Sequence, residues 1–132
     1  MRSGGINWLA VIASAVAIYA IGAVIYALLF ADWWMAMAGV TQEEMAANTR
    51  MPYSIVMPLM TAIFLAVLFK WGNVDNLAKG AKWGLVVALA SAVPALWYGW
   101  VYGSGPAELT LLDSGHVLLG HIAAGAILGG WK

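Results

Sequence analysis

The stretch Trp8–Phe30 reads WLAVIASAVAIYAIGAVIYALLF and carries no charged residue over its 23 positions. At about 1.5 Å of rise per residue, a helix of this length reaches roughly 34 Å, which is enough to cross the hydrocarbon core of a bilayer. The apolar core of a signal peptide is shorter, about 7–15 residues, and ends in a small-residue cleavage site. We therefore interpret about Ile6–Phe30 as a retained transmembrane helix.

Three more apolar runs follow in the remainder of the 132-residue chain, and we expect helices over about 52–71, 82–102 and 114–131, with Asp113 or Ser114 as the last N-cap. Because lipid offers no partners to free backbone groups, each run should be helical. The chain is 64% hydrophobic and 9% charged, whereas soluble domains carry about a quarter charged residues. The sequence thus predicts one all-α domain over 1–132, a four-helix transmembrane bundle.

The connection after the first helix is the longest one. Its segment Thr41-Gln42-Glu43-Glu44 matches a capping box, with Thr41 as N-cap and the Glu44 side chain reaching back. We expect a short helix over about Gln42–Ala47 lying at the membrane interface. The alternative is that these are ordinary loop and helix-extension residues.

Charged residues are divided unequally between the two sides of the expected bundle. Five bases lie on the side of the termini and the second connection, namely Arg2, Lys70, Lys79, Lys82 and Lys132, and the other side has Arg50 alone. Short loops rich in Lys and Arg stay in the cytoplasm, so both termini are expected there. Tryptophans at both boundaries agree with interfacial anchoring, with Trp71, Trp83 and Trp131 on the inner side and Trp33, Trp34, Trp97 and Trp100 on the outer side.

Small residues form stripes along the expected helices. The third helix carries Gly84, Ala88, Ala92, Ala95 and Gly99 on one side, and the fourth ends in a GxxxG formed by Gly125 and Gly129. Small residues let helix backbones approach closely in lipid. These stripes are candidate packing residues inside the bundle, and a self-association face is the second interpretation.

Polar residues inside a membrane are costly and are therefore functional candidates. Tyr19, Thr61, Ser91 and His121 each lie about eight to ten residues from a helix end, roughly 12–15 Å deep. We expect a polar layer at mid-membrane, with His121 hydrogen-bonded to one of the other three and His116 nearer the outer face. Alternatively, Ser and Thr bond to their own preceding turn, and His121 is structural, a proton carrier or an axial ligand.

Several classes of function are disfavoured. The net charge of zero argues against nucleic-acid binding, and the absence of cysteine excludes thiolate sites. His116 and His121 are about 140° apart around a helix, so they do not form a two-histidine metal site. No catalytic motif is recognisable, and no cofactor can be specified. Pro58 and Pro94 interrupt the second and third helices, which either kinks them at a site or reflects the general frequency of proline in membrane helices.

Both ends of the chain resemble domain-of-unknown-function family 1761. The residues that carry the resemblance are Ile6-Asn7-Trp8-Leu9-Ala10-Val11, Gly22, Tyr26, Trp34-Met35, Gly39, Glu43-Glu44, His116 and Gly125-Ala126-Ile127-Leu128-Gly129-Gly130-Trp131. A Trp-Tyr-Ser-Pro-like stretch of the family is replaced here by Ile25-Tyr26-Ala27-Leu28. The resemblance implies a small bacterial inner-membrane protein of four helices without an assigned activity.

Three functions are compatible with these features. The first, which the sequence favours, is a non-catalytic membrane protein that acts as a homo-oligomer or as an accessory subunit of a membrane complex. The second is a binder or carrier of a small lipid-soluble molecule, using the polar layer around His121 and Tyr19. The third is a membrane enzyme with His116 or His121 as its base, and the sequence favours this one least.

Overall fold

The computed structural model describes residues 2–131, and most of them are helical. The elements in chain order are β1 (Arg2–Ser3), β2 (Ile6–Asn7), α1 (Trp8–Ala23), the π-helical turn η1 (Val24–Leu29), α2 (Ala31–Ala38), α3 (Gln42–Ala46), the 3₁₀ turn η2 (Met51–Ile55), α4 (Val56–Trp71), α5 (Leu77–Val87), the π-helical turn η3 (Ala88–Ala92), α6 (Val93–Tyr102) and α7 (Ala107–Gly130). The prediction of an all-α chain is confirmed.

Four continuous helical stretches are long and apolar enough to cross a membrane: Trp8–Leu29, Met51–Trp71, Leu77–Tyr102 and Ala107–Gly130. Large apolar side chains cover their outer surfaces, for example Leu28 at 76% and Phe64 at 64% exposed. Such a surface suits contact with lipid, where exposed apolar area costs nothing. The four predicted spans are therefore present, and the chain has the character of a multi-pass membrane protein.

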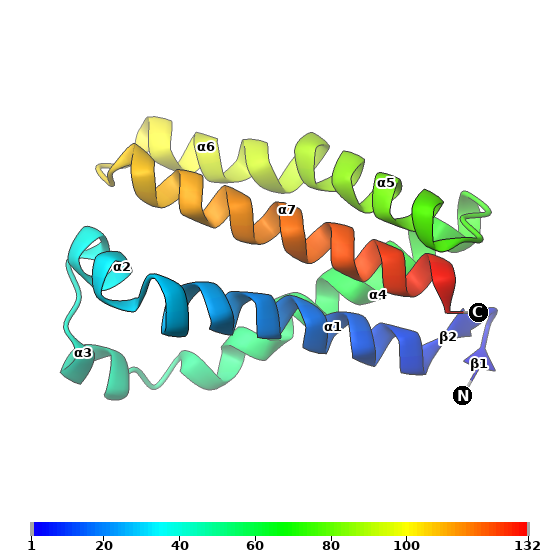
Figure 1. The fold of residues 1–132 in the computed structure, drawn as a ribbon, viewed down its shortest axis with the longest axis horizontal. Coiled ribbons are helices and arrows are strands. Elements are labelled where there is room, and N and C mark those ends of the chain that lie inside the picture. Colours follow the sequence, from blue (N-terminus) through cyan, green and yellow to red (C-terminus); the bar gives the residue numbers. More distant parts are fainter. Residues whose placement is uncertain (1, 132) are drawn as a thin grey trace.

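Helix α7 lies at the centre of the bundle. It packs against α5 on one side and α1 on the other, while α4 packs mainly against α1. Figure 1 shows both termini at one end of the bundle, together with the connection from α4 to α5, and α2 and α3 at the opposite end. The buried core contains the α1–α4 contact, in which Val11 and Ala62 are fully buried.

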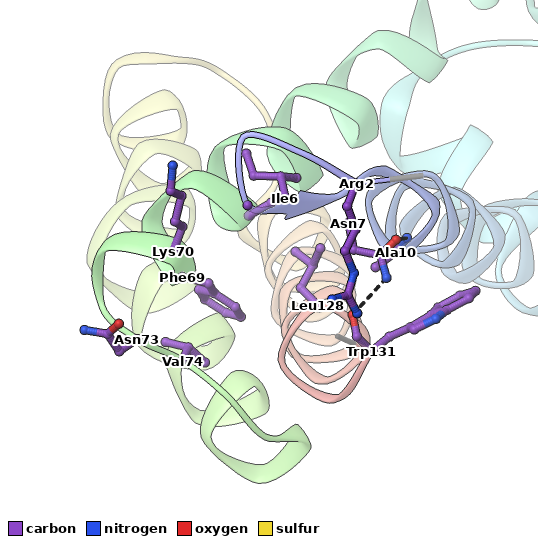
Figure 2. A pocket seen from close by; sticks show the side chains of 12 residues that line it. Arg2, Ile6, Asn7, Ala10, Phe69, Lys70, Asn73, Val74, Leu128 and Trp131 are labelled. Carbon is purple, nitrogen blue, oxygen red and sulfur yellow. Dashed lines mark hydrogen bonds between the residues drawn. The ribbon is translucent and has the colours of Figure 1, made fainter.

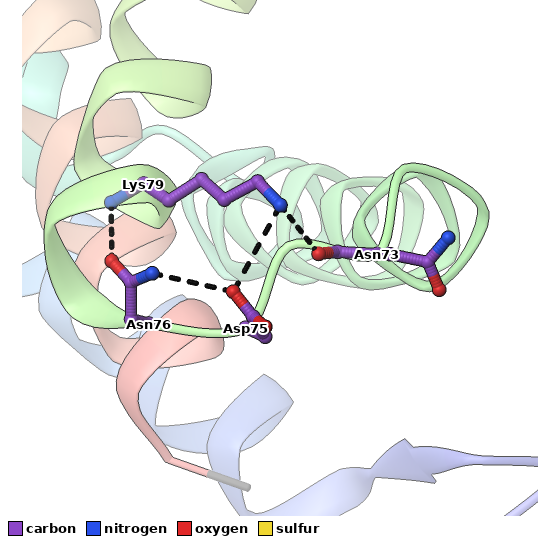
Figure 3. Close-up of polar contacts among 4 residues, drawn as sticks. All are labelled: Asn73, Asp75, Asn76 and Lys79. Carbon is purple, nitrogen blue, oxygen red and sulfur yellow. Dashed lines mark hydrogen bonds and ion pairs between the residues drawn. The ribbon is translucent and has the colours of Figure 1, made fainter.

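The predicted start of the third helix is five residues too late, because α5 begins at Leu77. Asn76 is its N-cap and accepts a hydrogen bond from the backbone N–H of Lys79 at 2.9 Å. The Lys79 ammonium donates to the carbonyl of Asn73 at 2.7 Å and pairs with Asp75 at 3.8 Å (Figure 3). The prediction counted only the apolar run, so it left out this polar first turn, although the turn is helical.

The predicted N-cap at Asp113 or Ser114 is wrong for the same reason. Helix α7 begins at Ala107 after Pro106, and Glu108 lies in its first turn, where the helix dipole favours an acidic side chain. Asp113 and Ser114 are therefore interior helical residues. Ser114 is buried, and its hydroxyl donates to the carbonyl of Thr110, one turn earlier.

Four glycines form the contact between α5 and α7. A Cβ on Gly80, Gly84 or Gly125 would lie far inside van der Waals contact with backbone of the facing helix, and one on Gly129 would lie 2.5 Å from the carbonyl oxygen of Asn76. Ala88 extends the same contact and is fully buried. In contrast, Ala92 is half-buried and Gly99 is exposed with open space around it. The described structure thus places the GxxxG of α7 inside the bundle.

Both prolines lie where the type of helix changes. Pro58 is in the first turn of α4, directly after the 3₁₀ turn η2, and Pro94 is in the first turn of α6, directly after the π-helical turn η3. A proline cannot donate the helical hydrogen bond and its ring crowds the preceding turn. The local change of helix type accommodates this within a continuous span.

The predicted short helix in the first connection is confirmed as α3. The Thr41 hydroxyl accepts from the Glu44 N–H at 3.2 Å, and the Thr41 N–H donates to the Glu44 carboxylate at 2.8 Å, which completes the capping box. These hydrogen bonds from Thr41 hold the pKa of the Glu44 carboxyl below its ordinary value of 4.5.

Acidification should therefore loosen this cap. A carboxyl whose pKa is lower in the folded state stabilises that state above its unfolded pKa and loses this effect as the pH falls through the folded pKa. We expect the Glu44 carboxyl carbon, followed by NMR, to titrate with a midpoint below 4.5. Glu44→Gln retains the hydrogen bond without a titrating group, so the Thr41 amide shift should become independent of pH. A midpoint at or above 4.5 in the wild type would contradict the capping geometry.

Candidate functional site

The end of the bundle opposite the termini contains a cavity of about 750 Å³. Its walls come from α1 and η1, from α4 and from α7, and α2, α3 and η2 contribute the part farthest from the termini. Four of the five candidate ligand-binding residues line this cavity, namely Tyr19, Thr61, His116 and His121. Three transmembrane spans thus bring together polar residues that are far apart in the sequence.

One ring nitrogen of His121 is bonded to the backbone of its own helix. Its Nδ1 lies 2.8 Å from the carbonyl oxygen of Val117, one turn earlier on α7. Because a carbonyl can only accept, Nδ1 carries the proton, and Nε2 of the neutral ring is an acceptor that has no partner among residues 2–131. The half-buried ring lines the cavity. The predicted hydrogen bond to Tyr19, Thr61 or Ser91 is not among those of residues 2–131. Nδ1 bonds instead to the carbonyl of Val117, which lies one turn earlier on the same helix.

His116 packs edge-on against a neighbouring aromatic ring. Its ring centroid lies 5.2 Å from that of Tyr26, at an interplanar angle of 89°, and its Nε2 lies 3.4 Å from the carbonyl oxygen of Ile18. Gly22 makes room for the ring, because a Cβ there would lie 2.9 Å from Nε2. The resemblance to the family named both Gly22 and His116, and the structure brings them into contact.

Tyr26 also joins α7 through its hydroxyl, which donates to the Asp113 carboxylate at 2.5 Å. Tyr26 belongs to the π-helical turn η1, a type of turn that often occurs at functional sites. A hydrogen bond to a carboxylate is stronger than one between neutral groups. Sequence reasoning missed this pair, since it placed Asp113 at a helix end outside the membrane.

Much of the remaining wall is apolar and adaptable. Four methionines line the cavity: Met35, Met45, Met51 and Met57. They come from α2, α3, η2 and α4, so no spacing along the chain could have grouped them. An unbranched thioether side chain adopts many shapes, and surfaces rich in methionine accommodate varied apolar partners.

Two further members of the predicted polar layer, Thr61 and Ser91, differ in their positions. Thr61 is the midpoint of the span Met51–Trp71 and is half-buried. Ser91 is exposed, donates to the carbonyl of Val87 at 2.7 Å, and is not among the residues that line the cavity. Ser91 therefore follows the alternative in which a serine bonds to its own preceding turn. The other three residues of the predicted layer, on three helices rather than four, line the cavity.

The polar groups of the cavity can form hydrogen bonds with a small molecule. Within residues 2–131, no three His, Asp or Glu side chains are grouped closely enough to hold a metal. The cavity offers one imidazole acceptor and the hydroxyls of Tyr19 and Thr61 within a mainly apolar wall. An apolar ligand with one or two hydrogen-bonding groups fits this chemistry.

Comparison with known proteins gives one match. The model of the family described as "Protein of unknown function (DUF1761)" matches residues 9–129, which confirms the resemblance found in the sequence. No match was found among curated proteins or among solved structures.

Proposed function

The chain belongs to the DUF1761 family of proteins of unknown function, and we propose that it is an intramembrane binder or carrier of a small lipid-soluble molecule. The ligand has an apolar body and a head group that donates a hydrogen bond. Its binding site is the cavity lined by Tyr19, Thr61 and His121. The protein acts in a bacterial inner membrane, with both termini on the cytoplasmic side.

The observation that carries this proposal is the cavity itself. Protein interiors are close-packed and leave few voids larger than a water molecule, whereas sites for small ligands measure about 300–1,000 Å³ and are mostly apolar with a few convergent polar groups. The cavity of about 750 Å³ lies within that range. A bundle whose only role was to pack would have no reason to leave such a space beside two histidines.

The polar atoms define which head group binds. Because Nδ1 of His121 is engaged by Val117, Nε2 accepts from a ligand hydroxyl or N–H. The hydroxyls of Tyr19 and Thr61 supply further hydrogen bonds from the facing helices. The methionine-lined part of the cavity, at the end remote from the termini, takes the apolar body.

A ligand can enter from the lipid. Tyr19 lines the cavity and is 48% exposed, at the middle of a membrane span. We infer that the cavity opens to the surface of the bundle beside this side chain. A lipid-soluble molecule can enter there without crossing water.

The orientation rests on charge. Arg2, Lys70 and Lys79 all belong to the end of the bundle that carries the termini, where Asn7 of the first strand pair donates to the carbonyl of Trp131 at 3.2 Å. The excess of bases on this end supports a cytoplasmic location for both termini.

The alternative function, a non-catalytic oligomer or accessory subunit, stays a prediction. The GxxxG glycines Gly125 and Gly129 are in contact with α5, so they are not free to form a contact between protomers. Gly99, at the end of the other small-residue stripe, is exposed and has open space around it.

A photoreactive probe tests the proposed function directly. The protein is reconstituted in nanodiscs with a long-chain alcohol that carries a diazirine, irradiated, and digested for mass spectrometry. We expect labelling that unlabelled alcohol competes away, concentrated on the peptides containing Met57–Thr61 and His116–His121. Phe64, on the exposed side of the same helix α4, is the internal control for labelling from bulk lipid. Labelling that is spread evenly over exposed residues and is not competed would contradict the proposal.

A further inference from the structure

A second cavity, of about 310 Å³, lies at the end of the bundle that carries the termini. It is bounded by the N-terminal hairpin of β1 and β2, the end of α4 and the end of α7 (Figure 2). It is separate from the cavity around His121, and the two share no lining residue.

The charged side chains on the wall of this second cavity are both basic as far as residues 2–131 go. Arg2 and Lys70 line it, and no Asp or Glu of that range does. Figure 2 shows the two side chains on opposite sides, Lys70 beside Phe69 and Arg2 toward Trp131. The single ion pair found among residues 2–131 joins Asp75 and Lys79, so it engages neither base. Within the described residues, an anion that enters between Arg2 and Lys70 would meet two cations and no Asp or Glu side chain.

The N-terminal hairpin holds this arrangement in place. Gly4 and Gly5 form its turn with φ of 59° and 77°, a conformation that glycine adopts without a steric penalty. The turn pairs Arg2 with Asn7, which brings the start of the chain back over the cavity. The same turn lies against the other base, because a Cβ on Gly5 would be 3.4 Å from Cε of Lys70. Ile6, which was expected to begin the first helix, lies with Asn7 in β2 instead, and Asn7 is the N-cap of α1, which begins at Trp8. The hairpin is also joined to the end of α7, because Asn7 donates to the carbonyl of Trp131.

The rest of the lining is partly apolar. Ala10, Phe69 and Leu128 line it, and Asn7 and Asn73 add neutral polar groups. Phe69 is almost fully buried, so this part of the wall belongs to the hydrophobic core. The cavity therefore combines two basic side chains with an apolar part of its wall.

We propose that this cavity binds the phosphate-bearing head group of an anionic phospholipid from the leaflet at the termini. The phosphate lies between Arg2 and Lys70, and the first part of the acyl chains covers the apolar part of the wall.

The depth of the cavity favours a lipid over a soluble phosphate compound. Lys70 lies in the last turn of the span Met51–Trp71, and the hairpin directly precedes the span that starts at Trp8. These positions are at the level where head groups meet the hydrocarbon. Trp71 and Trp131 are exposed there, at 75% and 48%, as expected for side chains that anchor at this level.

Lipid retention measured by native mass spectrometry tests this proposal. The full chain is released from nanodiscs of mixed phosphatidylglycerol and phosphatidylcholine, and the bound lipids are identified. We expect the wild type to retain phosphatidylglycerol over phosphatidylcholine by about tenfold or more, and R2Q/K70Q to lose this preference. K79Q is the matched control, because it removes a base at the same end that already contacts Asp75 and Asn73. It should keep the preference, and so should K70R.

Two results would overturn the proposal. One is an unchanged preference in R2Q/K70Q with a wild-type melting temperature. The other is displacement of the retained lipid by millimolar glycerol 1-phosphate, which would assign the site to a soluble phosphate compound. Neither result depends on ligand binding near His121, because the photoreactive alcohol reports that cavity separately.

Discussion

Replacing Gly125 with alanine should lower the free energy of unfolding by about 3 kcal/mol, because the new methyl group has no space. Its Cβ would overlap the carbonyl of Gly80 on the facing helix, which is backbone and cannot rotate away. The two helices would have to separate, and α5 packs mainly on α7. Separating the helices at Gly125 would therefore weaken the whole contact between α5 and α7, and not the contact of this residue alone.

Gly115→Ala on the same helix is the matched control. Nothing lies within 4 Å of the position that its Cβ would take, so the change should be neutral or should stabilise the helix by up to about 1 kcal/mol. Both variants are followed by circular dichroism during unfolding in mixed micelles of detergent and sodium dodecyl sulfate. Equal stability of the two variants would show that α5 and α7 do not touch along these glycines.

Replacing His121 with leucine should raise the concentration of unlabelled long-chain alcohol needed to compete with the photoreactive probe by about tenfold. The variant fills a similar volume with an apolar group but removes the Nε2 acceptor, so the ligand hydroxyl loses the hydrogen bond that it donates to His121. A linear alkane of the same length has no hydroxyl and should compete equally well against wild type and variant.

Ser91→Ala is the control for the His121 experiment. Ser91 is about as deep as His121 by sequence, but it is exposed and bonded to its own helix, so this variant should bind like the wild type. Unchanged competition by the alcohol in His121→Leu, with a wild-type circular dichroism spectrum, would contradict a role for the imidazole in binding.

The spans could be predicted from the sequence, whereas two of the helix starts could not. An apolar run such as Trp8–Phe30 reports the thickness of the hydrocarbon core, and the four spans follow from that. It does not report the polar turns in which a helix continues into the head-group region. Both late predictions, at α5 and α7, omitted such turns. Gly80 was missed with them, although it is part of the closest helix contact.

The candidate site could be predicted in part. The cost of placing polar groups in lipid singled out Tyr19, Thr61 and His121, and the structure places all three on one cavity. The same rule also selected Ser91, because depth in the membrane does not specify which face of a helix a residue occupies. The methionines, and the hydrogen bond between Tyr26 and Asp113, depend on how the helices pack, which no spacing in the sequence records.

A crystal structure of the protein, extracted with its native lipids and crystallised from a lipidic mesophase, tests the proposed function most directly. We expect elongated density in the cavity between α1, α4 and α7, with its polar end within hydrogen-bonding distance of Nε2 of His121. A cavity closed by its own side chains, with Met57 and Met45 packed against His121 and no bound molecule, would contradict the proposal that the bundle binds a ligand.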